Sequence, residues 1–328
     1  MEEKQLDIKL QFPRNIEIQT QSLCNANCKI CPYEKVSRMD KVGGYHKLPL
    51  EIIYSIIDDA SKYKEIEFIK PYMNNEPFLD NRIIDILRYI KNKGIATEIS
   101  TNASCLDEEL TRKIVDEQLV DDFRISFFSV DKEKYKELMP GLDYDRTLQR
   151  IQFFIDYNRK HNNIIPLQIV QVMYDGMNLD AEKKLLNMLF KGTQKHFFGY
   201  LDRAGNNDKK NSTILIEYPE ATLRGCKLAR LEETMTIAAN GNVIICSQDW
   251  AQENVLGNII KESLKDIITG NKRTDYLRQL YGIGKCSEDF LCKKCKLANI
   301  ALKNSNDVIQ NFKGDYFMQP DDKKSTSY

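Results

Sequence analysis

Residues 16–31 read IEIQTQSLCNANCKIC. Apolar and polar residues alternate over Ile16–Thr20, which predicts a half-buried β-strand. Three cysteines, Cys24, Cys28 and Cys31, follow within eight residues. We expect them on the loop between this strand and the first helix, where three thiols so close together indicate one small metal centre.

Short strands and amphipathic helices alternate from this point to about residue 200. The predicted strands are Ile16–Thr20, Glu65–Pro71, Ile95–Thr101, Asp122–Ser129, Leu167–Met173 and Lys195–Tyr200. The predicted helices are Leu50–Tyr63, Asn81–Lys93, Asp107–Gln118, Tyr144–Arg159 and Asp180–Leu189. Such alternation is typical of βαβ units around a parallel sheet. A repeat of roughly 31 residues matches a (β/α)8 barrel, so a partial barrel or an open α/β sheet would fit.

The composition narrows the class of protein. A length of 328 residues allows two domains, or one large domain with an appendage. Lys+Arg and Asp+Glu each number 48, which argues against a chain that coats nucleic acid or an anionic membrane. No apolar run is long enough to span a membrane, and the charged N-terminus does not resemble a secretory signal. We therefore expect a cytoplasmic protein without nucleic-acid or membrane partners.

The pattern changes after residue 205. The polar stretch NNDKKNS at 206–212 predicts a loop. Asn240-Gly241 lies between Glu233–Ala238 and Val243–Cys246 and predicts a β-hairpin, and short helices are expected near Ser263–Ile268 and Thr274–Tyr281. These features predict three parts: a barrel at 1–205, a small α+β domain at 206–312 and a polar tail at 313–328.

The nine cysteines and three histidines favour a thiolate-rich metal site. An odd number of cysteines without an export signal does not indicate a disulfide framework. Thiolates suit either iron–sulfur clusters or zinc. Three of them cannot close a four-iron cluster, so one iron would be left open to another ligand. A structural zinc with a remote fourth ligand, or three unrelated thiols, are the alternatives for the first group.

The first cysteine group resembles the signature of a known family. Cys24-Asn-Ala-Asn-Cys28-Lys-Ile30-Cys31 resembles the C-x-x-x-C-x-φ-C motif of the radical SAM superfamily. The resemblance implies a partial (β/α)6 barrel in which three cysteines hold a [4Fe–4S] cluster and S-adenosylmethionine (SAM) ligates the open iron. It also implies reductive cleavage of SAM to methionine and a 5′-deoxyadenosyl radical, which abstracts a hydrogen atom. A flavodoxin- or ferredoxin-type protein would supply the electron.

Further matches follow the predicted strands. Asn74-Asn75-Glu76-Pro77 resembles the G-G-E-P motif that contacts the SAM amino group, although it has Asn-Asn where the family has Gly-Gly. Asn is the next most tolerant residue for positive φ, and a solvated turn is the alternative. Further residues carried over as SAM-binding candidates are Ile30 and Tyr33, beside the adenine, and Ser100, Asn102, Ser126 and Ser129, near the ribose and carboxylate. Core packing or ordinary strand-end polarity are the alternatives for these.

The remaining cysteines resemble a second cluster site. Cys226, Cys246 and the pair Cys292-x-x-Cys295 resemble the auxiliary twitch or SPASM domain, which carries a further [4Fe–4S] cluster. A zinc-ribbon-like site is the alternative, because four thiolates also suit tetrahedral zinc.

Three more residues are candidates for roles in the reaction. Cys105 and Cys286 are interpreted as buried thiols or as hydrogen donors, and Cys286 could replace Cys226 as a ligand. Arg203, in the segment 202–206, is a candidate substrate clamp, with a surface ion pair as the alternative.

The resemblance favours a radical SAM oxidoreductase or epimerase. The first strand begins near residue 16, which we interpret as leaving no room for an N-terminal peptide-recognition domain. We therefore expect a small polar substrate, such as a sugar- or aminoglycoside-like alcohol, and its dehydrogenation or epimerisation. A maturase acting on a short precursor peptide is the first alternative. A non-catalytic scaffold that binds zinc or an iron–sulfur cluster is the alternative of another class.

Overall fold

The computed structural model describes residues 12–36, 44–199, 203–207 and 222–301, with the backbone of β12 (Val308–Gln310) and β13 (Phe317–Met318). Most of the predicted loop at 206–212 and nearly all of the predicted tail at 313–328 lie outside these residues. The chain divides into two compact units that interleave in sequence. The first unit comprises residues 1–24, 31–97 and 202–311, and the second comprises 25–30, 98–201 and 312–328.

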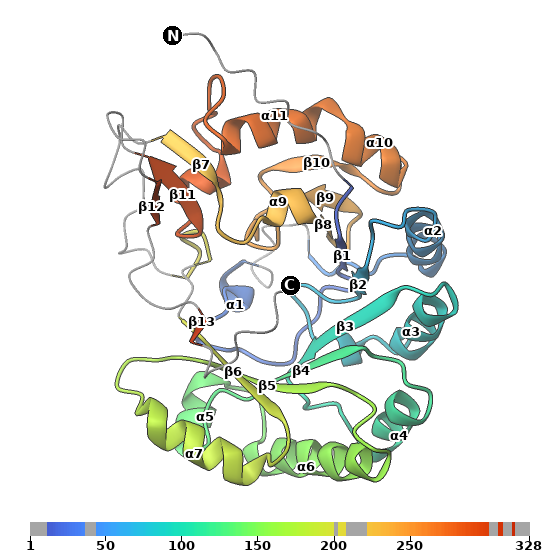
Figure 1. Ribbon diagram of the computed structural model, residues 1–328, viewed down its shortest axis with the longest axis vertical. Coiled ribbons are helices and arrows are strands. Elements are labelled where there is room, and N and C mark those ends of the chain that lie inside the picture. Colours follow the sequence, from blue (N-terminus) through green and yellow to red (C-terminus); the bar gives the residue numbers. More distant parts are fainter. Residues whose placement is uncertain are drawn as a thin grey trace. The chain divides into compact units, whose positions relative to one another are not determined.

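In the first unit, a central sheet surrounds β1 (Asn15–Ile18). Its neighbours are the parallel strands β2 (Phe68–Lys70) and β8 (Thr234–Ile237), and the sheet continues through β9 (Asn242–Ile244) and β10 (Val255–Asn258). The helices α2 (Leu50–Ala60) and α3 (Ile83–Asn92) belong to the same unit (Figure 1). Isoleucines recur at helical spacing along both and are buried, so one apolar face of each helix packs inward.

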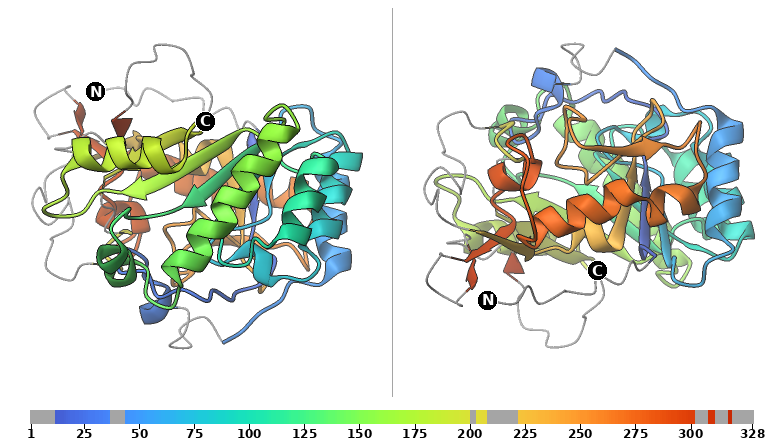
Figure 2. Two further views of the ribbon diagram at one scale, coloured as in Figure 1. Left: turned by 90° about the horizontal axis from the view of Figure 1, so that it is seen from below. Right: turned by 90° about the horizontal axis from the view of Figure 1, so that it is seen from above.

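In the second unit, the strands β3 (Ala96–Thr101), β4 (Asp122–Ser126), β5 (Leu167–Val172) and β6 (Gln194–Phe198) are parallel neighbours. Its helices are α4 (Glu108–Asp116), α5 (Lys132–Leu138), α6 (Tyr144–Lys160) and α7 (Leu179–Leu189). Each helix begins after an Asp or Asn whose side chain accepts a backbone N–H of the first turn. Figure 2 shows α6 and α7 lying along one face of the strands.

Each consecutive pair of strands from β1 to β6 is parallel. This confirms the predicted α/β fold class, a partial barrel of six strands in sequence order. The predicted helix Asp107–Gln118 corresponds to α4, with Asp107 as its N-cap. Helix α5 was not predicted, because only Tyr135 and Leu138 of its seven residues face the interior.

The C-terminal part of the first unit contains the predicted hairpin of β8 and β9, with Gly241 at φ +85° in its turn. The short helix α9 (Arg230–Glu233) precedes the hairpin, and α10 (Leu264–Thr269), α11 (Asn271–Leu280) and the 3-10 turn η2 (Leu291–Lys294) follow it. A second sheet joins β7 (Thr222–Cys226), β11 (Ala298–Ala301) and β12. Figure 2 shows α10 and α11 packed over β10.

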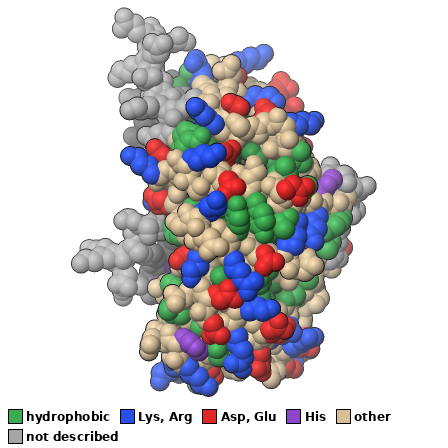
Figure 3. Space-filling view, turned by 90° about the vertical axis from the view of Figure 1, so that its right-hand side faces the viewer, with side chains coloured by type: hydrophobic (Ala, Val, Ile, Leu, Met, Phe, Trp, Pro, Cys, Tyr) green, Lys and Arg blue, Asp and Glu red, His purple; other side chains and the backbone are tan. Residues whose placement is uncertain are grey.

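The surface is mixed in charge. Figure 3 shows a face on which Lys and Arg side chains are interspersed with Asp and Glu, as the balanced composition leads us to expect. Within the described residues, no helix is both long and apolar enough to cross a bilayer.

Candidate functional site

Cys24 and Cys31 pack against a small buried cluster in the first unit, formed by Tyr33, Val36 and Trp250. Tyr33 begins the short helix α1 (Tyr33–Val36) and is only 5% exposed. Its hydroxyl accepts the backbone N–H of Cys24 at 2.8 Å and donates to the carbonyl of Ser22 at 2.9 Å. Tyr33 therefore fixes the start of the cysteine loop, while its contact with the adenine stays a prediction.

The middle of the loop, residues 25–30 with Cys28 and the candidate Ile30, belongs to the second unit and is held by the segment 138–141. The N–H of Asn27 donates to the carbonyl of Pro140 at 2.8 Å, and that of Lys29 to Leu138 at 2.9 Å. Gly141 has φ +93°, and a Cβ there would lie 2.9 Å from the carbonyl oxygen of Asn25. The close approach therefore requires a glycine.

Asn102 ties the end of β3 to the same loop. Its Nδ2 donates to Asn25 Oδ1 at 3.0 Å, and its Oδ1 accepts the N–H of Ser104 at 2.9 Å. Asn25 Nδ2 in turn donates to Ser104 Oγ at 2.8 Å. Ala103, the residue after Asn102, adopts φ +58° while fully buried. The local structure thus keeps the left-handed turn at this strand end, with strain that a glycine would avoid.

The Asn-Asn-Glu-Pro segment lies after β2 at the start of the 3-10 turn η1 (Pro77–Leu79). Glu76 is 2% exposed, and its Oε1 accepts the N–H of Phe78 at 3.2 Å. Asn75 Oδ1 accepts the N–H of Met73 at 3.0 Å, and Asn75 Nδ2 is buried without a hydrogen-bond partner among the described residues. Neither Asn74 nor Asn75 has positive φ, so replacing the glycine pair causes no backbone strain.

The polar residues at the end of β4 form a buried network with Glu182. Ser129 is fully buried, and its hydroxyl donates to Glu182 Oε1 at 2.9 Å and accepts the N–H of Asp131. Tyr174 also donates to Glu182. Ser129 would have to give up one of these bonds to contact a ribose. Ser126 and Ser100 are half-buried on their strands, and their roles stay predictions.

Arg203 lies close enough to Cys31 to act on its thiol. Burial raises the pKa of Cys31, and the positive charge of Arg203 opposes this. Arg203 Nε is buried and has no hydrogen-bond partner within the described part of the chain. A buried thiol stays protonated unless a cation favours its thiolate, so this part of the loop suits a bound metal centre. The role of Arg203 as a substrate clamp stays a prediction.

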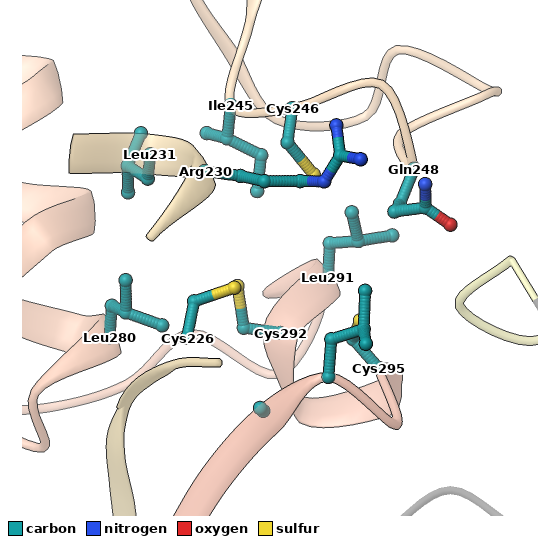
Figure 4. Close-up of a pocket in the computed structure, with 12 residues that line it drawn as sticks. Cys226, Arg230, Leu231, Ile245, Cys246, Gln248, Leu280, Leu291, Cys292 and Cys295 are labelled. Carbon is teal, nitrogen blue, oxygen red and sulfur yellow. The ribbon is translucent and has the colours of Figure 1, made fainter. Parts of the chain in front are cut away.

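The four cysteines of the predicted auxiliary site line one pocket in the first unit, of about 400 Å³ (Figure 4). Cys226 ends β7, Cys246 follows β9, and Cys292 and Cys295 lie in and just after η2. Burial raises the pKa of Cys246 to about 12 and raises that of Cys292 well above its usual value, and the charge of Arg230 opposes the rise at Cys246. Thiols such as Cys246 and Cys292 ionise readily only beside a cationic centre, which a cluster provides.

The pocket between these cysteines can accommodate an iron–sulfur cluster. None of the nine cysteines forms a disulfide. Among the residues that the structure describes, no group of three or more His, Cys, Asp or Glu side chains converges as a single metal ion requires. An iron–sulfur cluster spreads its ligands around several irons, and the pocket between the four thiols leaves room for such a group.

Neither of the two unassigned cysteines is among the residues that line this pocket. Cys286 is half-buried and is not among the residues that line it, whereas Cys226 is. Cys105, in the second unit, has its Sγ 3.9 Å from Ser104 Oγ. Their roles as hydrogen donors stay predictions.

A second pocket of about 380 Å³ in the first unit was not foreseen from the sequence. Its lining is largely polar and comes from the ends of β1 and β2 and from the hairpin region, namely Gln19, Ser22, His46, Asn74, Asn240, Asp249, Trp250 and Gln252. Trp250, the single tryptophan of the chain, is 5% exposed, and its Nε1 has no hydrogen-bond partner among the described residues. A buried donor without a partner is costly, which suggests that a ligand oxygen completes it.

One turn connects the two pockets. Cys246 lines the first, and Asp249, Trp250 and Gln252 line the second. The carboxylate of Asp249 accepts the N–H groups of Glu253 at 3.0 Å and Asn254 at 2.8 Å and so holds the turn. The signal that could have indicated these residues is the lone Trp four positions after a predicted ligand.

Comparison with known proteins identifies the family. A model described as the radical SAM superfamily matches residues 18–189, more than half of the chain. The chain belongs to the radical SAM superfamily. A second model, described as the SPASM iron-sulfur cluster-binding domain, matches residues 226–296. This radical SAM enzyme therefore uses a SAM-binding [4Fe–4S] cluster and carries an auxiliary cluster.

Two curated relatives match part of the chain. The cofactor-modifying protein of tungsten-containing aldehyde ferredoxin oxidoreductase from Pyrococcus furiosus is 31% identical over 95 residues, 29% of this chain and 25% of that protein. The S-adenosyl-L-methionine-dependent 2-deoxy-scyllo-inosamine dehydrogenase of Niallia circulans is 25% identical over 118 residues, 36% of this chain and 47% of that protein. The chain thus spans between a quarter and a half of these relatives.

Solved radical SAM structures share the fold over most of the chain. BtrN in complex with AdoMet and 2-DOIA has a TM-score of 0.55 and 18% identity, covering 94% of this chain and 99% of BtrN. SuiB from Streptococcus suis bound to its precursor peptide SuiA has a TM-score of 0.64 and 18% identity, covering 87% of this chain and 70% of SuiB. At these identities the likeness establishes the fold alone.

Proposed function

We propose that this radical SAM enzyme oxidises a small polar metabolite, a sugar- or aminoglycoside-like alcohol, by dehydrogenation. This proposal rests on the second pocket, which is called the polar pocket from here on. The pocket is concave and is lined by several polar side chains, as small-molecule sites often are. Its amide, hydroxyl and imidazole groups suit a ligand with several hydroxyl or amino groups. Trp250 Nε1 supplies an unsatisfied donor for one ligand oxygen.

Named residues have separate roles in this proposal. Cys24, Cys28 and Cys31 hold the SAM-binding cluster, and Cys226, Cys246, Cys292 and Cys295 hold the auxiliary cluster. The chemistry that these groups supply when bound is reductive cleavage of SAM to a hydrogen-abstracting 5′-deoxyadenosyl radical and a site that can accept one electron. Glu76 and the neighbouring polar groups orient SAM, and the polar side chains that line the polar pocket hold the substrate.

Two relatives favour this substrate class. One curated relative is named a dehydrogenase of 2-deoxy-scyllo-inosamine, and BtrN, whose structure contains AdoMet and 2-DOIA, matches this chain over nearly its whole length. Dehydrogenation needs an electron acceptor, which the auxiliary cluster supplies. Epimerisation instead needs a hydrogen donor, and Cys105 and Cys286 are the candidates. If both Cys105→Ala and Cys286→Ala keep full turnover, neither thiol is an essential donor.

A peptide maturase is the second candidate function. The likeness to SuiB bound to its precursor peptide has a TM-score of 0.64, against 0.55 for BtrN. A peptide would need a longer groove than the polar pocket, so the two functions differ in where the substrate is held.

Isotope transfer tests the proposal. The anaerobically reconstituted chain should contain about eight irons and cleave SAM to 5′-deoxyadenosine when reduced with dithionite. Aminocyclitols and amino sugars deuterated at carbinol carbons should transfer deuterium to 5′-deoxyadenosine, and Trp250→Phe should reduce this transfer more than it reduces uncoupled cleavage. Transfer from deuterated peptides but from no polyol would overturn the small-metabolite proposal.

A further inference from the structure

Arg230 brings a positive charge to the auxiliary pocket. It is the first residue of α9 and is among the residues that line the pocket. In Figure 4 its side chain extends along the pocket toward Cys246 and Gln248.

Arg230 is held in place by two partners outside the pocket lining. Its Nη1 donates to Ser247 Oγ at 2.8 Å and lies 3.5 Å from Glu17 Oε1. Glu17 is on β1, its carboxyl is 12% exposed, and it accepts a hydrogen bond from Thr236. Glu17 does not line the pocket, and its carboxylate offsets part of the positive charge of Arg230.

The side-chain amide of Gln248 adds a hydrogen-bond donor to the lining of the pocket. It is 2% exposed and lines the pocket next to Leu291 (Figure 4). Its Nε2 is buried and has no hydrogen-bond partner among the described residues. Buried amide donors are seldom left unsatisfied in native proteins, so Gln248 Nε2 is available to an acceptor bound in the pocket.

A nearby cation and a hydrogen-bond donor change the reduction potential of an iron–sulfur cluster in the same direction. Four thiolates give the cluster a net negative charge, and adding one electron makes it more negative. Positive charge and hydrogen bonds to sulfur stabilise the reduced form more than the oxidised form, so both raise the reduction potential. A neighbouring carboxylate has the opposite effect.

We propose that Arg230 and Gln248 raise the reduction potential of the auxiliary cluster, and that Glu17 limits the effect of Arg230. The inference rests on the proposed assignment of the four cysteines to that cluster. In this inference Arg230, Gln248 and Glu17 set the charge and hydrogen bonding around the cluster and are not catalytic residues. A higher potential makes the cluster a better acceptor of one electron, as an oxidation requires.

The test is a redox titration of the loaded full-length enzyme with SAM, followed by electron paramagnetic resonance. The signal that changes on adding SAM reports the first cluster and serves as an internal reference. The variants are Arg230→Gln, Arg230→Lys, Gln248→Leu and Glu17→Gln. Arg224→Gln is the matched control, because Arg224 is exposed on β7 and does not line the pocket.

Removing the positive charge of Arg230 and removing the negative charge of Glu17 should shift the reduction potential of the auxiliary cluster in opposite directions. Arg230→Gln should lower the equilibrium constant for reduction of the auxiliary cluster at least tenfold, a fall of about 59 mV for one electron. Gln248→Leu should lower it as well, Glu17→Gln should raise it, and Arg230→Lys and Arg224→Gln should stay near wild type.

Iron analysis separates failure of this inference from failure of the proposed function. A wild-type chain with only about four irons would refute the auxiliary assignment itself. With about eight irons, unchanged potentials in both Arg230→Gln and Glu17→Gln would overturn the inference. If Arg230→Gln does not assemble its cluster, a potential in Glu17→Gln at or below that of wild type is sufficient to overturn it.

Discussion

Replacing Gly141 by alanine should disturb the cysteine loop far more than its small size suggests. The new Cβ would lie 2.9 Å from the carbonyl oxygen of Asn25, whereas ordinary contacts begin at 3.4 Å. The obstacle is backbone and cannot rotate away, so the loop must move by roughly half an ångström. The residue would also keep φ +93°, which costs an L-residue about 1–2 kcal/mol.

Gly192 offers a matched control for the backbone strain. It belongs to the same unit and has φ +85°, but a Cβ there would meet nothing within 4 Å. Gly192→Ala should therefore lose about 1 kcal/mol of unfolding free energy from strain alone. Gly141→Ala adds the overpacking cost and should lose roughly 2–4 kcal/mol. The difference between the two variants isolates the contact with the loop.

Anaerobic urea unfolding, iron content and SAM cleavage together measure the effect. Gly141→Ala should lose SAM cleavage and fall from about eight toward about four irons per chain, because residues 25–30 are displaced. Gly192→Ala should keep both. The reasoning is refuted if Gly141→Ala cleaves SAM at the wild-type rate and is no less stable than Gly192→Ala.

Two other substitutions test the surroundings of the loop and of β6. Tyr33→Phe removes the hydroxyl that accepts from Cys24 and donates to Ser22, so the free energy of unfolding should fall by about 1–3 kcal/mol. An unchanged free energy of unfolding, measured in urea, would show that water replaces the hydroxyl. Burial, aided by Arg124, lowers the pKa of His196 in the folded state, so wild-type stability should fall as pH drops from about 7.5 to about 5.5. His196→Gln should flatten this dependence, and equal slopes would contradict it.

The sign of the His196 effect follows from linkage. Its pKa is lower in the folded state than in the unfolded chain, so the unfolded chain binds the proton first. The stabilising contribution of the neutral ring is therefore complete above the unfolded pKa and is lost as the pH falls toward the folded one. Asp122 opposes the shift and limits its size.

Local patterns predicted most of the fold. Helix α6 begins at Tyr144, as predicted, because Asp143 caps it and its apolar residues recur at helical spacing. Strands β7 and β11 were missed because they pair with each other across more than 70 residues of chain. Strand β10 was not predicted, because Val255–Asn258 is short and contains a glycine.

The features of the candidate site that depend on local sequence were predicted, and those that depend on distant segments were not. Cysteine spacing is local and could be interpreted directly, and the four auxiliary cysteines do line one pocket. The contribution of Arg230 depends on Glu17, more than 200 residues away in sequence. The role of Gly141 depends on a carbonyl at Asn25. No periodicity or short motif encodes such pairs, because they form only when distant segments pack together.

The turn that joins Cys246 to Trp250 has a consequence for how this enzyme can diverge. Changing substrate preference by inserting or deleting residues in this turn would also move a thiol of the auxiliary pocket. Asn254, whose side chain accepts the N–H of Leu291 next to Cys292, extends that dependence to a second thiol. With the substrate held as proposed, new specificities should therefore arise by exchanging side chains at fixed loop length, and transplanting the polar pocket alone into another scaffold should fail.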